Sequence, residues 1–161
     1  MAFEIATIPL ENGARLGISP LPGRDGVGLA DMAALARWGP DIVVSMTEPA
    51  EMERHNMGDL GGLCAGFGIA WAHFPVRDFS APEMAENWES LSPRLHRLLD
   101  QGGAVLAHCY GGHGRSGMVL LRLMVERGEE PKAALARLRA ARPGAVERQS
   151  QFAWAASGVG G

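Results

Sequence analysis

Residues 103–117 read GAVLAHCYGGHGRSG, an apolar run that ends in a glycine-rich turn holding a cysteine and an arginine. The run 104–107 is typical of a short buried strand, and the apolar spacing of residues 118–125 is typical of a helix. The turn therefore precedes a helix N-terminus, where unpaired N–H groups and the helix dipole favour an anion. Glycines also let backbone amides face a ligand without interference from side chains. The stretch predicts a phosphate site.

Three side chains of this turn indicate what happens to the phosphate. Cys109 lies where the same amides would stabilise a thiolate, the nucleophilic form of cysteine. Arg115 follows six positions later and offers a planar guanidinium that contacts two phosphoryl oxygens while keeping its charge. Ser116 can donate a hydroxyl hydrogen bond to the sulfur and later help it leave. The pattern predicts attack on phosphorus by Cys109.

The segment HCYGGHGRSG resembles the signature loop of the cysteine-dependent protein tyrosine and dual-specificity phosphatases, in which Cys, five residues, Arg and Ser follow one another. The resemblance implies hydrolysis of phosphoprotein monoesters through a phosphocysteine, with no metal and no cofactor. It implies that His108 supports the loop from beneath. The implied phosphate-binding residues are Tyr110, Gly111, Gly112, His113, Gly114 and Arg115.

The resemblance also implies a general acid, because the departing oxygen would otherwise leave as an unstable anion. Asp78 is the candidate, in a phrase (PVRDFSAPE) similar to the family's mobile acid loop; a solvated or helix-capping loop aspartate is the alternative. Gln151 is our candidate for positioning water. The neighbouring Glu147 and Gln149 leave that assignment open.

The loop also fits parts of other sequence patterns. Gly112, Gly114 and Gly117 spell a dinucleotide-binding fingerprint, but the expected second strand and acidic residue do not follow. A metal site at His108, Cys109 and His113 lacks a second ligand cluster. A rhodanese-like sulfurtransferase would need no arginine, and a catalytically silent phosphopeptide-binding module would need no acid. Cys64 could form a protective disulfide with Cys109, although a small buried hydrophobe is the more common role.

Composition limits the class of protein. The chain has 161 residues, so we expect one phosphatase domain over residues 1–161, with a frayed tail at 157–161, and a monomer. A net charge of −3 without basic blocks argues against nucleic acid as a partner. Two cysteines make no disulfide framework, which favours the cytoplasm. The longest near-apolar run, residues 63–72, is too short for a membrane span.

The expected fold is α/β, with a central, mostly parallel twisted sheet covered by helices on both faces and the signature loop at the carboxyl end of its strand. A hairpin of strands 3–8 and 15–19 opens it around Asn12-Gly13. Further strands are expected at 41–46, 69–76 and 104–108. Helices are expected at 31–38 with Asp31 as N-cap, 48–56, 59–67, 83–100 with a kink or restart at Ser92-Pro93, 118–125, 131–141 and 147–156. Phosphotyrosine is the expected substrate, with phosphoserine and phosphothreonine added if the pocket is shallow.

Overall fold

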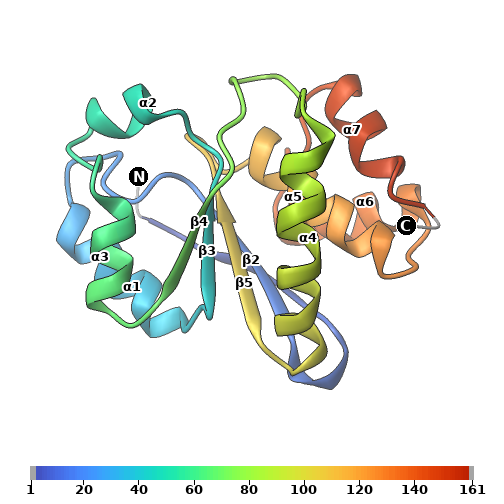
Figure 1. The fold of residues 1–161 in the computed structure, drawn as a ribbon, viewed down its shortest axis with the longest axis horizontal. Helices are drawn as coiled ribbons and strands as arrows, with labels where there is room; N and C mark the ends of the chain where they lie inside the picture. Colours follow the sequence, from blue (N-terminus) through green and yellow to red (C-terminus); the bar gives the residue numbers. More distant parts are fainter. Residues whose placement is uncertain (1–2, 160–161) are drawn as a thin grey trace.

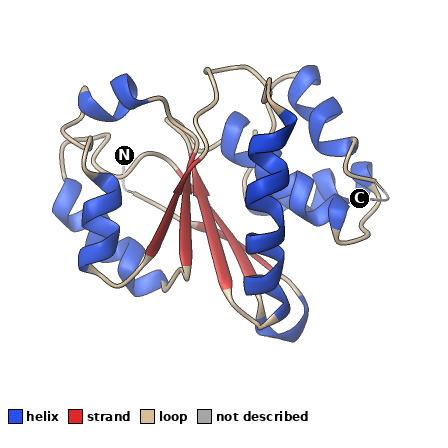
Figure 2. Ribbon diagram, viewed as in Figure 1, coloured by secondary structure: helices blue, strands red, loops and turns tan. Residues whose placement is uncertain are grey.

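The computed structural model describes residues 3–159, which form one five-stranded sheet in the order β1-β2-β5-β3-β4 (Figures 1 and 2). The strands are β1 (Ala6–Pro9), β2 (Arg15–Ser19), β3 (Ile42–Ser45), β4 (Ala70–His73) and β5 (Ala104–His108). Only β1 is antiparallel to its neighbour, and the opening hairpin turns through a short 3-10 segment, Glu11–Gly13. The predicted mostly parallel sheet is confirmed.

Within the described residues, seven α-helices cover the sheet. They are α1 (Gly28–Trp38), α2 (Pro49–Glu53), α3 (Leu60–Gly66), α4 (Ala85–Asp100), α5 (Gly114–Glu126), α6 (Pro131–Ala141) and α7 (Gln149–Ala156). Helices α1 to α3 lie on one side of the sheet and α4 to α7 on the other, as predicted for a two-sided fold (Figure 1). Each face has its own cluster of buried apolar side chains.

Strand β5 lies in the middle of the sheet, parallel to both of its neighbours. Its last residue, His108, is level with Ser19 at the end of β2 and Ser45 at the end of β3. All five residues of β5 are buried. The register therefore brings three strand ends together at one edge of the sheet and places the signature loop there.

The structure corrects two local predictions, one at Asp31 and one at Ser92-Pro93. Helix α1 begins at Gly28, so Asp31 lies inside its first turn rather than at the N-cap. The Asp31 carboxylate is buried there and accepts a hydrogen bond from the Gly23 N–H at 2.8 Å, which fixes the preceding loop. Of the predicted kink or restart at Ser92-Pro93, the restart is absent, because α4 runs through Pro93 as one helix; the neighbouring Ser92 hydroxyl donates to Glu126 at 2.7 Å.

Several element ends differ from the predicted ones. Strand β4 ends at His73, three residues early, because the chain then turns into the loop that carries Asp78. Helix α5 begins at Gly114, four residues early, so Arg115 lies in its first turn. Helix α7 begins at Gln149, two residues late. Residues 157–159 of the predicted tail form a turn, and residues 160–161 lie outside the described part.

None of the helices between residues 3 and 159 combines the length and apolar character needed to cross a lipid bilayer.

Candidate active site

The signature loop joins β5 to α5 and holds Cys109 almost fully buried, with 3% of its surface exposed. The Cys109 Sγ lies 3.1 Å from the Ser116 Oγ, the distance of a hydrogen bond to sulfur. Gly112 has a φ of +75°, and a Cβ there would lie 2.6 Å from the Ser19 carbonyl carbon, so only glycine fits. The predicted association of Cys109 with Ser116 is present.

The backbone of the loop is held in place by Arg142, at the C-terminal end of α6. Its Nε donates to the Gly112 carbonyl and its Nη2 donates to the Gly111 carbonyl, each at 2.9 Å. Residues 110–113 donate no backbone hydrogen bond to any other described residue. The Gly111 and Gly112 carbonyls therefore point to Arg142, while the amides of the loop remain available to an anion. Sequence reasoning placed Arg142 only at a helix break and missed this contact.

Arg115 is fully buried and held by Glu51 of α2. The two guanidinium Nη atoms donate to the two Glu51 carboxylate oxygens at 2.7 and 2.8 Å, and Nη1 also donates to the Val76 carbonyl at 3.0 Å. Burial alone would raise the pKa of Glu51, but its bonds to Arg115 hold that pKa below its ordinary value. The Arg115 Nε is buried and has no hydrogen-bond partner among the described residues. Sequence reasoning missed Glu51.

Asp78 lies beside this arginine, on the loop that follows β4. Its Oδ1 is 3.3 Å from the Arg115 Nη2 and accepts a hydrogen bond from the Phe79 N–H at 3.0 Å. The Asp78 side chain is 47% exposed, so it also faces solvent. Phe79 has a φ of +63°, and the Arg148 guanidinium stacks on its ring at 4.9 Å from the centroid. The structure thus brings together Asp78 and Arg115, two of the residues that the sequence proposes for the site.

Gln151 of α7 is completely buried between the acid loop and the signature loop. Its Nε2 donates to the Ser80 carbonyl at 3.2 Å, and its Oε1 accepts from the Glu147 N–H at 2.9 Å. A Cβ at Gly114 would lie 3.1 Å from the Gln151 Nε2 and would also meet the Glu147 carboxylate. Gln149 is exposed. Gln151 and Glu147 are therefore the members of this group that lie against the signature loop.

His108 lies beneath the loop in a chain of hydrogen bonds. The Trp71 Nε1 donates to the Ser45 Oγ at 2.7 Å, which leaves the Ser45 hydroxyl to donate to the His108 Nε2 at 2.6 Å. The other ring nitrogen, Nδ1, then donates to the Cys109 carbonyl at 3.2 Å. Burial lowers the pKa of His108 to about 4, so the ring is neutral, as this chain requires. His108 touches the cysteine through its backbone, consistent with a supporting position.

The remaining sequence candidates are Tyr110, His113 and Cys64. Tyr110 and His113 line a cavity of about 440 Å³ beside the loop, and burial lowers the pKa of His113. Cys64 packs in the apolar cluster on the opposite face of the sheet from Cys109, and burial raises its pKa to about 11. Within residues 3–159, no cluster of three or more His, Cys, Asp or Glu side chains could hold a metal ion.

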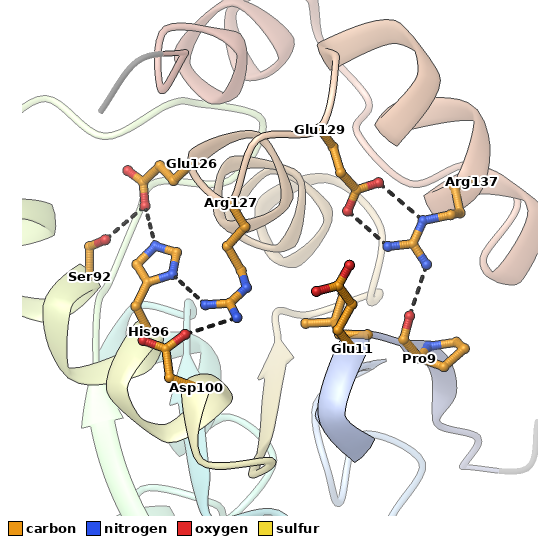
Figure 3. Close-up of a pocket in the computed structure, with 10 residues that line it drawn as sticks. Pro9, Glu11, Ser92, His96, Asp100, Glu126, Arg127, Glu129 and Arg137 are labelled. Carbon is orange, nitrogen blue, oxygen red and sulfur yellow. Dashed lines mark hydrogen bonds and ion pairs between the residues drawn. The ribbon is translucent and has the colours of Figure 1, made fainter.

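A cavity of about 780 Å³ lies at the opposite edge of the sheet, where β1 ends and β5 begins (Figure 3). Most of its charged side chains pair with one another: Arg127 with Asp100 at 3.0 Å, and Arg137 with Glu129 at 2.8 Å. Glu126 there accepts hydrogen bonds from several donors around it. Because these charges satisfy each other, the cavity offers little to a ligand.

Comparison with known proteins decides the family. A family model described as "Polymorphic toxin system, DSP-PTPase phosphatase" matches residues 21–129, which include the acid loop, the signature loop and α5. The chain belongs to the dual-specificity phosphatases. It is therefore a cysteine-dependent phosphoprotein phosphatase, as the signature loop predicted.

Individual relatives agree with this membership. A protein named Cyclin-dependent kinase inhibitor 3 from Sus scrofa is 31% identical over 161 residues, covering 93% of this chain and 76% of the relative. Its namesake from Mus musculus is 28% identical over 160 residues, covering 93% of this chain and 75% of that protein. The crystal structure of a kinase-associated phosphatase, with its catalytic-site cysteine replaced by serine, superposes with a TM-score of 0.84 at 25% identity, over 96% of this chain and 93% of that one. The Tyr-Gly-Gly after Cys109 predicts likeness to the cyclin-dependent-kinase-associated phosphatase in particular, and this prediction is confirmed.

Proposed function

We propose that Cys109 is the nucleophile of this dual-specificity phosphatase. Its thiolate attacks phosphorus, an S–P bond forms, and the bond from phosphorus to the substrate oxygen breaks. Ser116, 3.1 Å away, donates to the sulfur and stabilises its negative charge when it later leaves. The burial of Cys109 under the loop keeps water away from the thiolate until substrate enters.

The phosphoryl oxygens bind to the amides of residues 110–115 and to Arg115. The observation that carries this proposal is the combination of unused loop amides with a buried Arg115 Nε that lacks a partner. A buried donor without an acceptor costs about 1–3 kcal/mol, and a phosphoryl oxygen would supply that acceptor. Glu51 holds the guanidinium so that its remaining N–H groups face the same oxygens. The cradle stabilises the charge that spreads over these oxygens in the transition state.

Asp78 is the general acid. It lies on the arginine side of the loop and keeps solvent exposure, so it can exchange protons with water and reach a leaving oxygen. In the second step the same carboxylate takes a proton from the water that attacks the phosphocysteine. Gln151, which lies between the acid loop and Gly114, positions that water, and His108 holds the loop from beneath without exchanging a proton.

The substrates we propose are phosphotyrosine residues of proteins and, if the pocket is shallow, phosphoserine and phosphothreonine residues as well. The names of the relatives, which concern a cyclin-dependent kinase and a kinase-associated phosphatase, support a protein substrate. We also propose a cytoplasmic monomer that binds neither nucleic acid nor membranes, since both of its cysteines are free and its charges are mixed.

A Cys109→Ser variant tests the assignment, with Cys64→Ala as the matched control. Turnover of p-nitrophenyl phosphate should vanish in Cys109→Ser while vanadate still raises its melting temperature, because the amides and Arg115 are intact. The control variant should retain turnover. A Cys109→Ser protein that keeps more than a trace of wild-type rate would refute the covalent mechanism, and tight phosphate binding with little turnover by the wild type would favour a phosphopeptide-binding module instead.

A further inference from the structure

The loop that carries Asp78 joins β4 to α4 and passes beside the start of α7 (Figure 1). Two contacts connect it to that helix. The Gln151 Nε2 donates to the Ser80 carbonyl at 3.2 Å, and the Arg148 guanidinium lies over the Phe79 ring, 4.9 Å from its centroid. The two residues that follow Asp78 in the chain are therefore both held by the beginning of α7.

Phe79 is the residue of this loop whose conformation most needs such support. Its φ of +63° lies in the left-handed region, which side chains other than glycine rarely adopt. Residues in that region persist where contacts around them fix the backbone. Phe79 is 49% exposed, so the core of the protein does not supply these contacts. Its N–H donates to the Asp78 Oδ1 at 3.0 Å, and the backbone of Phe79 and the Asp78 carboxylate are thus placed together.

Arg148 is the N-cap residue of α7, a position to which its side chain is poorly suited. Ser, Asp or Asn at an N-cap accepts hydrogen bonds from the helix N–H groups, whereas a guanidinium has only donors. The Gln151 Oε1 accepts from the Arg148 N–H at 3.1 Å instead. Within residues 3–159, no carboxylate pairs with Arg148. Its guanidinium is thus free to form the cation–π contact with Phe79.

We propose that Arg148 is a positioning residue, which holds Phe79 so that Asp78 stays beside Arg115 before substrate enters. The contacts run from the Arg148 guanidinium to the Phe79 ring, and from the Phe79 N–H to Asp78. Asp78 in turn lies 3.3 Å from the Arg115 Nη2. A general acid acts only within reach of the leaving oxygen, so a loop held in this place raises the rate of ester cleavage. This inference rests on the proposed role of Asp78 and adds a residue that supports it.

The test replaces Arg148 by Ser, which removes the guanidinium and supplies a better N-cap. The melting temperature should therefore stay the same or rise. On a phosphotyrosine peptide, kcat should fall about two- to fivefold, the factor that an exposed cation–π contact contributes to an equilibrium. Turnover of p-nitrophenyl phosphate should change less than about 1.5-fold, since its leaving group needs little protonation. KM should stay within about twofold for both substrates, because the phosphate cradle is untouched.

Three further variants separate this contact from a general effect of charge. Arg148→Lys keeps a cation over the ring and should restore most of the lost kcat. Lys132→Gln removes an exposed cation that lines, with Arg148, a cavity of about 550 Å³, and it should leave both rates unchanged. Phe79→Leu should lower kcat on the peptide. Adding Arg148→Ser to it should cost nothing more, because the two residues act through one contact.

Trypsin measures release of the loop directly, because it cleaves after the exposed Arg77, next to Asp78. Cleavage of that bond follows the population of released loops when opening and closing are fast. In Arg148→Ser, this cut should be about two- to fivefold faster, as followed by mass spectrometry. In Lys132→Gln it should keep the wild-type rate.

Three results would overturn the inference. Wild-type kcat on the peptide in Arg148→Ser would show that other contacts hold the loop. Equal losses on both substrates with a lower melting temperature would make Arg148 a support of α7. A lower kcat on the peptide without faster cleavage after Arg77 would mean that Arg148 contacts the substrate itself. Asp78→Asn is the reference in each case: if it lost rate equally on both substrates, the proposed role of Asp78 would be wrong instead.

Discussion

Replacing Glu51 by Gln tests the idea that a distant carboxylate holds the phosphate-binding arginine in place. Both carboxylate oxygens accept from Arg115, at 2.7 and 2.8 Å, and both side chains are buried. Gln keeps the shape and one acceptor oxygen, but its amide NH₂ then faces an N–H donor of Arg115. The guanidinium loses its charge partner inside the protein.

The magnitude follows from the burial of the pair. Breaking a buried ion pair by removing one partner costs about 3–5 kcal/mol. Arg115 retains the Val76 carbonyl at 3.0 Å and Asp78 at 3.3 Å, so we expect the lower end, about 3 kcal/mol. For a domain of this size, that loss lowers the melting temperature by about 6–12 °C. We also expect kcat/KM to fall about tenfold or more, because a misaligned guanidinium no longer matches two oxygens.

The assay is urea unfolding followed by circular dichroism, combined with steady-state turnover of p-nitrophenyl phosphate. Glu53→Gln is the matched control, because Glu53 lies on the same helix but is exposed, and it should change stability by less than about 0.5 kcal/mol. If Glu51→Gln behaved like this control in both measurements, the argument that Glu51 positions Arg115 would be wrong.

Three further predictions concern other parts of the molecule. Asp78→Asn should lose about 100- to 10,000-fold in rate on phosphotyrosine peptides but far less on p-nitrophenyl phosphate, whose phenol is a better leaving group; equal losses on both would assign the acid elsewhere. Burial tends to raise the pKa of Glu126, but its hydrogen bonds lower that pKa to about 2, so its stabilisation is complete above pH 4.5 and is lost as pH falls toward 2. Urea unfolding across this range should show that dependence in the wild type and a flatter one in Glu126→Gln. Gly112→Ala should cost at least about 2 kcal/mol and most activity, because of its φ of +75° and the contact with Ser19, whereas Gly66→Ala, with open space around it, should fold normally on the same urea assay.

The parts of the site that sequence reasoning identified are close together along the chain or carry a family pattern. Cys109, Arg115 and Ser116 lie within eight positions of one strand-loop-helix unit, whose glycines and apolar periodicity already define its geometry. Identifying Asp78 required the resemblance to the phosphatase family, because a single aspartate in a loop forms no local sequence pattern. The sequence also predicted that residues 104–108 form a buried strand, because the run is apolar throughout, and all five residues of β5 are buried.

The parts that were missed act across long sequence separations. Glu51 meets Arg115 from 64 positions away, and Arg142 reaches Gly112 from 30 positions away. Each is one charged residue among many, and the residues next to it in the sequence form no pattern that indicates the contact. Asp31 was misplaced because its carboxylate binds the N–H of Gly23 in the preceding loop, while the capping pattern assumes that it binds its own helix. Tertiary contacts of this kind decide where single polar side chains lie, and sequence periodicity contains no information about them.

The contact between Asp78 and Arg115 limits which anions can bind at the arginine. A bare guanidinium at the base of a pocket would attract chloride or any simple carboxylate, and such ions would then compete with substrate. Here the Asp78 carboxylate already stands 3.3 Å from the Arg115 Nη2. A monoanion gains little by replacing one carboxylate with another, whereas a phosphate dianion that also reaches the loop amides gains several charge-assisted hydrogen bonds at once. The enzyme should therefore tolerate high concentrations of weak anions and respond chiefly to phosphate esters and to tetrahedral or trigonal-bipyramidal oxyanions that resemble them.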